Sequence, residues 1–187
     1  MNRPMPDIAV LKTLFRYDAE AGKLFWPPRT AAMFQEGRQT ARHKCARWNA
    51  LYADKEVKPR RKESGYLIVR ISTRPINVHR LAFALHHGRW PEGEVDHIDG
   101  DRANIKAANL RDVNRLENMR NKRRYRNNSS GITGVAWSKK SKRWVAHIGL
   151  KGKAKHIGQF TTFCTAVKAR SSAARSLGYH VNHGRAR

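Results

Sequence analysis

The sequence predicts an α+β protein of two small domains joined by a basic linker, and three observations carry this prediction. Residues 65–72 alternate with the two-residue period of a strand, and residues 77–86 carry apolar side chains at helical spacing. Residues 120–128 contain no apolar residue except a tyrosine, and three strand-like runs and one helical run follow them. The predicted divisions are an N-terminal region (1–64), a core (65–119), the linker (120–128) and a C-terminal domain (129–187).

The N-terminal region begins with a predicted helix. Asp7 is a favourable N-cap residue, and the apolar residues that follow it have helical spacing (Ile8, Leu11, Leu14 and Phe15). Residues 18–22 are typical of a turn, and they lead into a short strand at 23–26, which two prolines end. Residues 29–63 combine mixed charge with little periodicity, so no element is predicted there.

The C-terminal domain has the pattern of a minimal α+β module. Its three strand-like runs are separated by turn residues (134–138, 144–150 and 154–160). Residues 162–177 then have the period of an amphipathic helix, which Gly178 ends. We therefore expect a three-stranded antiparallel sheet packed on one helix.

The charge of the chain is strongly positive and unevenly distributed. The formal net charge is +25 over 187 residues, and Glu117 is the last acidic residue. Residues 119–187 contain 17 Lys and Arg and no Asp or Glu. A segment without carboxylates repels itself unless a polyanion compensates it, and nucleic acid is the usual one. The alternative is a solubilising basic tail or a ribosome-like chain, and charge alone does not indicate catalysis.

Other features restrict the setting in which the protein acts. No run approaches the roughly eighteen apolar residues of a membrane span, so none is expected. Residues 1–10 lack the apolar core of a signal peptide, and we expect the protein to stay in the cytoplasm where it is made. Cys45 and Cys164 are isolated, which favours a reducing cytosol over a disulfide framework or a cysteine zinc site.

The residues from Val95 to Asn118 include the groups that a single-metal nuclease needs. Such an enzyme needs one or two oxygen ligands for a hard cation and a neutral imidazole that takes a proton from water. Asp96 can supply the charged ligand and His97 the base, and Gly100 supplies a turn after the pair. Asn118, on a predicted helix some twenty residues later, can supply its neutral amide oxygen as a second ligand. Adjacent strand residues point to opposite faces, so the backbone must bend if both Asp96 and His97 are to serve one phosphate.

These residues resemble the HNH homing-type endonucleases, a family common in phages and mobile introns. The likeness lies in four segments: Val78-His79-Arg80-Leu81, Asp96-His97-Ile98-Asp99-Gly100, Asn109-Leu110-Arg111 and Glu117-Asn118. The segments Leu14–Trp26 and Gly65–Tyr66 also resemble phage members of this group. The resemblance implies a ββα-metal (His-Me) finger in which Asp96 and Asn118 bind the metal and His97 is the general base. It also implies that Asn109 braces the loop through backbone hydrogen bonds.

A DNA endonuclease with one Mg²⁺ per active site is the function that this resemblance implies, since oxygen ligands favour hard cations. Double-stranded DNA is the expected partner, and the cytoplasm of a bacterium or of a phage-infected host is the expected location. A monomer is expected, and one active site per chain implies that one strand is cut per encounter unless the protein dimerises. The alternatives are an RNA-binding protein and a non-catalytic DNA-binding regulator on a degenerate HNH scaffold. The residues Ile105 and Ala107 point to the regulator, because they depart from the usual family pattern.

The C-terminal domain resembles the Apetala/ethylene-response-factor DNA-binding domain, in which a three-stranded sheet lies in the major groove. The likeness lies in three segments (Ser130–Trp137, Lys142–Ile148 and His156–Thr162). It implies DNA contacts from six residues: Trp137, Lys139, Lys142, Arg143, Trp144 and Lys155. One of the two tryptophans is nevertheless expected to belong to the core of the sheet. Arg80 and the linker residues Arg123 and Arg124 are further expected DNA contacts. His79, beside Arg80, either packs in the interior or touches a phosphate.

Overall fold

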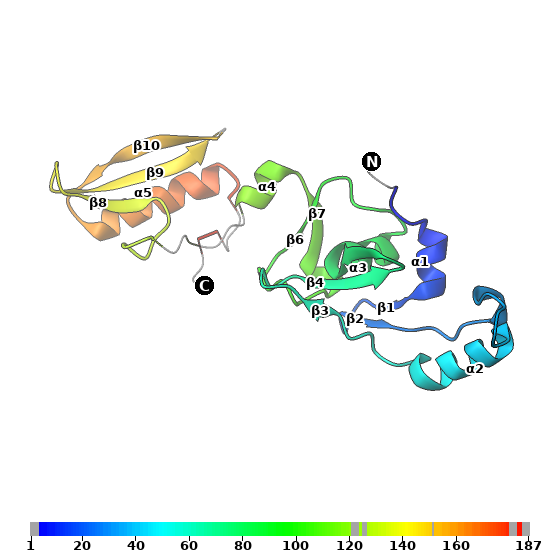
Figure 1. Ribbon diagram of the computed structural model, residues 1–187. Helices are drawn as coiled ribbons and strands as arrows, with labels where there is room; N and C mark the ends of the chain where they lie inside the picture. The colour runs from blue at the N-terminus through cyan, green and yellow to red at the C-terminus, as the bar shows by residue number, and fades with distance from the viewer. Residues whose placement is uncertain (1–3, 121–123, 125–126, 151, 180–182, 185–187) are drawn as a thin grey trace. The chain divides into compact units, whose positions relative to one another are not determined.

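The computed structural model divides the chain into two compact units, Met1–Val113 and Asn114–Arg187 (Figure 1). It describes residues 4–120, 124, 127–150, 152–179 and 183–184. The division comes before the linker predicted at 120–128, parts of which lie outside the described residues. Among the helices that are described, none has the length and apolar character needed to cross a membrane.

The first unit begins with the predicted helix and a hairpin that includes the predicted strand. Helix α1 (Ile8–Leu14) is capped by Asp7, whose side chain accepts a hydrogen bond from the Ala9 N–H at 2.7 Å. Strand β2 (Lys23–Phe25) is confirmed, and it pairs antiparallel with β1 (Arg16–Asp18), which was not expected.

The segment without a sequence prediction contains helix α2 (Ala41–Tyr52) and the two-residue strand β3 (Arg60–Arg61). The Thr40 side chain caps α2 by accepting a hydrogen bond from the His43 N–H at 3.2 Å. Only Ala41 and Cys45 are buried on this helix. The apolar face is therefore narrow, which explains why periodicity did not predict the helix.

The centre of the first unit is a small antiparallel sheet followed by a buried helix. Strands β4 (Leu67–Ile71) and β5 (Arg74–Asn77) pair with each other, and β3 adds to the free edge of β4. Helix α3 (Val78–His87) follows β5 directly and ends at Gly88, which has a left-handed φ of 69°. The strand and helix predicted at 65–72 and 77–86 are confirmed.

Helix α3 is the core helix of this unit. It buries five apolar side chains and one histidine (Val78, His79, Leu81, Ala82, Phe83 and Ala84). The apolar ones join a cluster with residues of α1, β2, β4 and β5. The cluster also takes Val95 and Leu110 from a second hairpin, formed by β6 (Glu94–His97) and β7 (Leu110–Val113).

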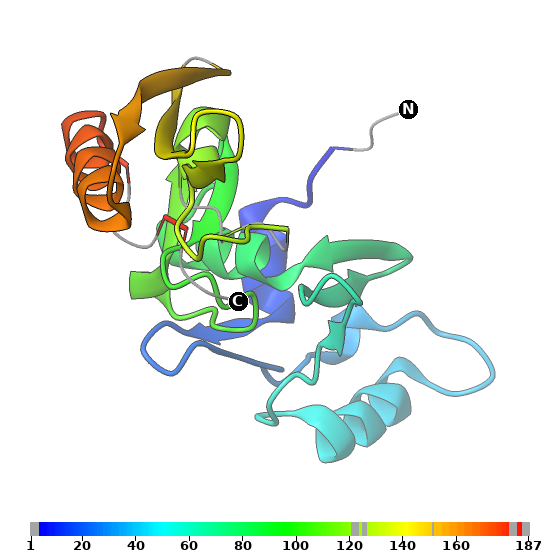
Figure 2. The ribbon, with the colours of Figure 1, turned by 90° about the vertical axis from the view of Figure 1, so that its left-hand side faces the viewer.

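The second unit contains the predicted three strands and helix. Strands β8 (Val135–Ser138), β9 (Arg143–Leu150) and β10 (Lys153–Phe160) form an antiparallel sheet in the order β10-β9-β8. Helix α5 (Phe163–Ser176) packs against this sheet, and Figure 2 shows it beside the strands in orange and red. A short helix, α4 (Arg115–Arg120), begins the unit.

Candidate active site

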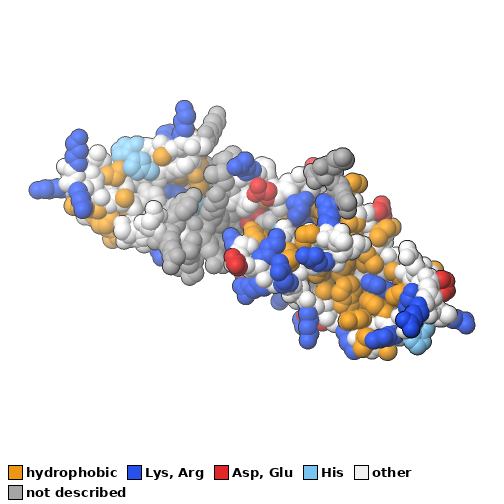
Figure 3. Space-filling model, viewed as in Figure 1, with side chains coloured by type: hydrophobic (Ala, Val, Ile, Leu, Met, Phe, Trp, Pro, Cys, Tyr) orange, Lys and Arg blue, Asp and Glu red, His pale blue; other side chains and the backbone are white. Residues whose placement is uncertain are grey.

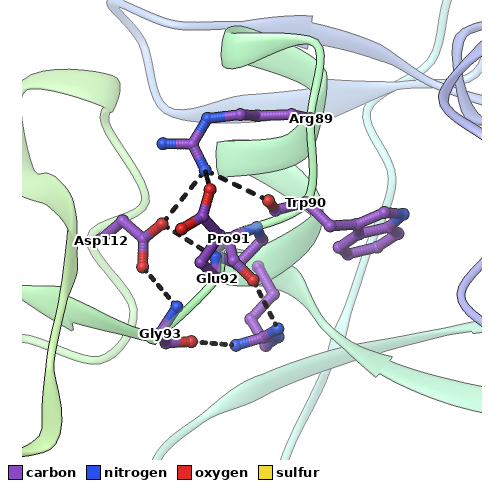
Figure 4. Close-up of polar contacts among 7 residues, drawn as sticks. Arg89, Trp90, Pro91, Glu92, Gly93 and Asp112 are labelled. Carbon is purple, nitrogen blue, oxygen red and sulfur yellow. Dashed lines mark hydrogen bonds and ion pairs between the residues drawn. The ribbon is translucent and has the colours of Figure 1, made fainter.

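Asp112 on β7 fixes the turn that leads into β6. Its Oδ1 accepts a hydrogen bond from the Gly93 N–H at 2.8 Å, and its Oδ2 accepts from the Glu92 N–H at 2.9 Å and from Arg89 at 3.3 Å (Figure 4). Burial opposes ionisation of Asp112, but the hydrogen bonds outweigh it and lower the pKa of the carboxyl. Gly93 is required here, since a Cβ would collide with the Val113 carbonyl oxygen.

The β6–β7 hairpin carries Asp96 and His97 at the end of β6. Its register places Asp96 opposite Arg111 and His97 opposite Leu110. Both Asp96 and His97 are buried, although neighbouring side chains of a strand point to opposite faces, so both faces of the hairpin are covered at this end. The chain turns at once after His97. Gly100 donates its N–H to the His97 carbonyl at 2.9 Å and has a φ of 71°.

Asn109 closes the loop between the two strands. Its amide nitrogen donates to Asp99 Oδ1 at 3.0 Å and to the Asn104 carbonyl at 2.9 Å, and its Oδ1 accepts from the Asp99 N–H at 2.9 Å. The Asn109 carbonyl accepts a further bond from the Ile98 N–H at 2.9 Å. One side chain therefore ties the residues that follow His97 to the start of β7, which fixes the direction in which the chain leaves the hairpin.

Asp99 is the partner of Asn109 in this loop, where the sequence predicted only a turn at Gly100 and the flanking Asp residues. Asn104 donates to its Oδ2 at 2.6 Å, and the Asp101 N–H donates to its Oδ1 at 2.8 Å. Burial opposes ionisation of Asp99, but the hydrogen bonds from Asn104, Asp101 and Asn109 outweigh it and lower the pKa of this carboxyl. Its two oxygens are occupied by structural donors.

The β1–β2 hairpin holds the other side of the loop. The Tyr17 hydroxyl donates to the Ile105 carbonyl, and the Ala107 N–H donates to the Ala19 carbonyl at 2.9 Å. The Ile105 side chain is buried in the core cluster. The two residues that depart from the HNH homing-type pattern are thus packed and hydrogen-bonded parts of the loop.

Arg111 binds the carboxylate of Asp96. Its Nε and Nη2 donate to Asp96 Oδ2 at 3.1 and 2.8 Å. The sequence shows Arg111 beside Asn109, but its partner depends on the register of the hairpin, so sequence reasoning gives it no role. A cation that binds Asp96 must share this oxygen with the guanidinium or displace it.

The environment of His97 favours its neutral form. The side chain is 3% exposed. Burial lowers the pKa of the imidazole, and the carboxylates of Asp96, Asp99 and Asp101 offset this only in part. A neutral imidazole is the form that can accept a proton.

His79 packs against His97 and does not reach the surface. It is 6% exposed, and its ring centroid lies 5.0 Å from those of both His97 and Tyr66. Burial, with smaller contributions from neighbouring charges, lowers the pKa of His79 to about 3. Of the two alternatives left open by the sequence, packing in the interior is therefore the one that the structure supports.

Asn118 lies on α4, and the start of that helix is defined by a reciprocal cap. The Asn114 side chain accepts from the Glu117 N–H at 2.9 Å, and the Glu117 carboxylate accepts from the Asn114 N–H at 3.0 Å. The Asn118 N–H donates to the Asn114 carbonyl at 3.0 Å. The hairpin with Asp96 belongs to the first unit and α4 to the second, so the meeting of Asp96 and Asn118 stays a prediction.

The predicted metal ligands are compatible with a hard cation. Asp96 offers a carboxylate oxygen and Asn118 an amide oxygen, which are donors that Mg²⁺ accepts. Within the described residues, no three His, Cys, Asp or Glu side chains gather where they could hold a metal ion. A site of this composition does not need such a cluster, because Asp96 is its single member of these four residue types.

The segment that runs from the end of β5 through α4 is similar to a known protein family. Residues 77–120 match the family model described as HNH endonuclease. This segment, called the HNH region below, contains all four residues that the sequence placed in the site (Asp96, His97, Asn109 and Asn118).

One curated relative and no solved structure resemble the chain significantly. Protein 3.8 of Escherichia phage T7 is 37% identical over 68 residues, which cover 36% of this chain. The chain matches 56% of that protein's length. A segment that matches the HNH endonuclease model and a relative from a phage are thus both found, in line with the resemblance noted in the sequence.

Two of the three arginines expected to touch DNA near the HNH region donate hydrogen bonds within the protein. Arg80 donates to the Gly93 carbonyl at 3.0 Å, which helps to hold the turn before β6. Arg124 donates to the Gly131 carbonyl. Arg123 lies outside the described residues. DNA contacts by these three arginines stay predictions.

The register of the β8–β10 sheet decides which side chains share a face. Ala146 and Ile148 of β9 are buried under α5. Trp144 has the same parity, and its ring lies 4.7 Å from that of Phe163 on α5. Arg143, one residue earlier, points to the opposite face. A duplex lying on one face of the sheet would therefore contact only one of Arg143 and Trp144.

The remaining predicted contacts of the second unit are accessible. Trp137 is 48% exposed, and its ring stacks edge-on against Trp144 at 5.4 Å. Of the two tryptophans, Trp144 is therefore the one that packs toward the helix. The predicted cationic contacts are all exposed (Lys139, Lys142, Arg143 and Lys155). Figure 3 shows Lys and Arg side chains in blue projecting from this unit at the left of the view.

Proposed function

We propose that the protein is a metal-dependent endonuclease that hydrolyses phosphodiester bonds in DNA. The observation that carries the proposal is His97, which is buried in a neutral state beside Asp96 on a braced hairpin, inside a segment that matches HNH endonucleases. The phage relative and the net charge of +25 support it. In this proposal the HNH region forms a ββα-metal finger from β6, β7 and α4.

His97 is the general base of the proposed reaction. A water molecule attacks the phosphorus atom and transfers a proton to the His97 imidazole as the P–O3′ bond breaks. The leaving 3′ oxygen takes a proton from solvent, so the products carry 5′-phosphate and 3′-hydroxyl ends. Because burial keeps His97 neutral, the base is already in its reactive form at neutral pH.

Asp96 and Asn118 are the proposed ligands of a single divalent cation, with Mg²⁺ as the ion that suits oxygen donors. The ion would supply positive charge against the scissile phosphate and the leaving oxygen. Arg111 donates two hydrogen bonds to Asp96 Oδ2. We infer that its positive charge compensates the negative charge of this buried carboxylate.

The second unit is proposed to hold the DNA. No Asp or Glu follows Glu117 in the sequence, so the exposed Lys and Arg side chains of this unit are not balanced by carboxylates. Phosphate groups of DNA would supply the missing negative charge. A role like that of the Apetala-type domain is supported by the order of three antiparallel strands and one helix. The exposed face that carries Arg143 is the part of the sheet best suited to lie against a duplex.

Incubation of the purified full-length protein with supercoiled plasmid tests this function. With Mg²⁺ we expect nicked circles whose ends carry 5′-phosphate, and with EDTA we expect none. A protein that binds the plasmid tightly but never cuts it, at any Mg²⁺ or Mn²⁺ concentration, would instead be a DNA-binding regulator. Competition with double-stranded RNA of equal length decides between DNA and RNA as the preferred partner.

A further inference from the structure

The sheet of the second unit carries two histidines side by side on its open face. His147 on β9 and His156 on β10 are register partners, so their side chains leave the same face of the sheet. His147 has the parity of Arg143, and this face is therefore the one that α5 does not cover. His156 is exposed and His147 is partly exposed. Figure 3 shows histidine side chains in pale blue at the surface of this unit.

The two rings have the spacing of a pair that chelates a metal ion. His147 Nε2 and His156 Nδ1 are 3.3 Å apart, and the ring centroids are 5.1 Å apart. Two histidine nitrogens bound at about 2.0–2.1 Å to one tetrahedral ion would be about 3.3–3.4 Å apart, and their ring centroids about 5.2 Å apart. Both observed distances therefore fit an ion held between the two rings.

The contact between the rings does not oppose such an ion. As a hydrogen bond, it requires one of the two nitrogens to carry a proton. A neutral imidazole has one N–H and one lone pair, and the proton can occupy either ring nitrogen. When the proton moves to the other nitrogen of its ring, both facing nitrogens present lone pairs. A cation can then take the place of the proton without any rearrangement of the strands.

The type of ligand decides which cation the pair can take. Imidazole nitrogen suits Zn²⁺, Cu²⁺ and Ni²⁺, whereas Mg²⁺ takes oxygen ligands. No Asp or Glu follows Glu117 in the sequence, so the sheet itself offers no carboxylate to a hard cation. Two protein ligands leave two positions of a tetrahedral ion for water or for a phosphate oxygen. The pair thus differs in kind from the oxygen site proposed for the HNH region.

We propose that His147 and His156 chelate one divalent cation of the Zn²⁺ type on the open face of the sheet. The ion adds positive charge to the face that carries Arg143, where the duplex is proposed to lie. The surrounding Lys and Arg repel the ion less once DNA phosphates neutralise them, so DNA and the ion raise each other's affinity by the same factor. This coupling rests on the proposed binding of DNA, whereas the metal site does not.

Substitutions in the full-length protein isolate this site from the HNH region. The parent is Asp96→Ala, which removes the charged ligand of the proposed Mg²⁺ site. His147→Gln and His156→Gln each remove one imidazole from this parent and keep a polar side chain. His43→Gln is the matched control, because His43 is an exposed histidine on α2. Circular dichroism with thermal denaturation shows that each variant folds.

The first readout is calorimetric titration with Zn²⁺ at pH 7.5 in excess Mg²⁺. We expect one Zn²⁺ per chain in the parent and in the His43→Gln control. Each substitution in the pair should weaken binding by at least about tenfold, the lower limit for loss of an outer partner of a metal-bound histidine. Saturable binding that survives both substitutions, its absence from the folded parent, or an equal loss in the control overturns the proposal.

The second readout is filter binding of duplex DNA with saturating Zn²⁺ or with EDTA. We expect Zn²⁺ to tighten DNA binding of the parent by about fivefold or more, a typical coupling between two sites, and to leave His156→Gln unaffected. Zn²⁺ that binds the pair without changing DNA affinity would overturn the placement of the ion against the duplex. If the parent does not bind DNA at all, the proposed function fails, and the titration alone decides the metal site.

Discussion

The two units of the molecule use their charges in different ways. The first unit contains 21 Lys and Arg and 13 Asp and Glu, and several of its carboxylates are bound inside it as caps, loop braces and ion pairs. The second contains 18 Lys and Arg and a single carboxylate, Glu117, which caps α4. Every ion pair found between described residues lies in the first unit.

This difference suits the first unit to hold groups in a fixed geometry and the second unit to attract a polyanion. Carboxylates that accept several short hydrogen bonds hold a few groups in one geometry, as Asp99 and Asp112 do around β6. Cations that are not matched by carboxylates contribute less to holding one geometry, but they attract any polyanion over a long range. We therefore expect catalysis to depend on a few single residues, all but Asn118 in the first unit, and affinity to depend on many residues of the second.

The largest expected effect is the loss of cleavage in His97→Ala with DNA affinity retained. Proton transfer by a positioned base contributes about 10²–10⁴-fold in rate, whereas dispersed cations supply affinity. Plasmid cleavage and filter binding are measured on the same preparation, with His43→Ala as the control. Cleavage by His97→Ala at more than roughly a tenth of the wild-type rate would exclude this residue as the base, by the same rate estimate.

A smaller effect is expected when four exposed cations of the second unit become glutamine (Lys139, Lys142, Arg143 and Lys155). Each lost phosphate contact lowers the slope of log affinity against log salt by about 0.9, so the slope should fall by about 3 to 4 units. The matched control replaces four exposed cations of the first unit (Lys12, Arg42, Arg47 and Lys55). If both sets change the slope equally, the second unit is not the DNA anchor.

Arg111→Gln tests whether the Arg111–Asp96 ion pair competes with the metal ion for the Asp96 carboxylate. Because the guanidinium holds Asp96 Oδ2, we expect calorimetry to show Mg²⁺ binding roughly two- to fivefold tighter, which corresponds to the up to ~1 kcal/mol of a partly exposed pair. Arg111→Lys should fall between this variant and the wild type. Asp96→Ala should show no binding heat, and unaltered metal affinity in that variant would remove Asp96 from the site.

A last expected effect, on folding and not on DNA, is the dependence of stability on pH. Burial lowers the pKa of His79 from its ordinary value of 6.5, expected in the unfolded chain, to about 3 in the folded protein. Between these values the unfolded chain binds a proton that the folded chain does not, so the stability of the first unit falls as the pH falls through this window. The slope is up to about 1.4 kcal/mol per pH unit. Urea unfolding at pH 7, 6 and 5 measures it, and His79→Phe should flatten it.

Elements with strong local signals could be predicted from the sequence. Asp7 before α1, the alternation in β4 and the helical spacing in α3 each depend on residues close together in the chain. Helix α2 could not be predicted from its apolar stripe, because it buries only Ala41 and Cys45. Its available signal was the cap residue Thr40.

The candidate site shows the same limit. The order and spacing of Asp96, His97 and Asn109 are visible in the sequence, because they belong to one short segment. The partners Arg111 and His79 depend on a strand register and on the packing of α3, which no local pattern contains. The opposite orientation of Arg143 and Trp144, by contrast, follows from the two-residue period of a strand and could have been predicted.

The loop that Asn109 closes has a consequence for how such a gene can change. Loops between strands usually accept insertions at little cost. Here Asn109 binds Asp99, ten positions earlier in the chain, through both its side-chain oxygen and its side-chain nitrogen, and it also holds the Asn104 carbonyl between them. A codon added or lost anywhere inside this stretch would move these partners apart. Lineages that keep the activity should therefore vary the letters of this stretch while keeping its length.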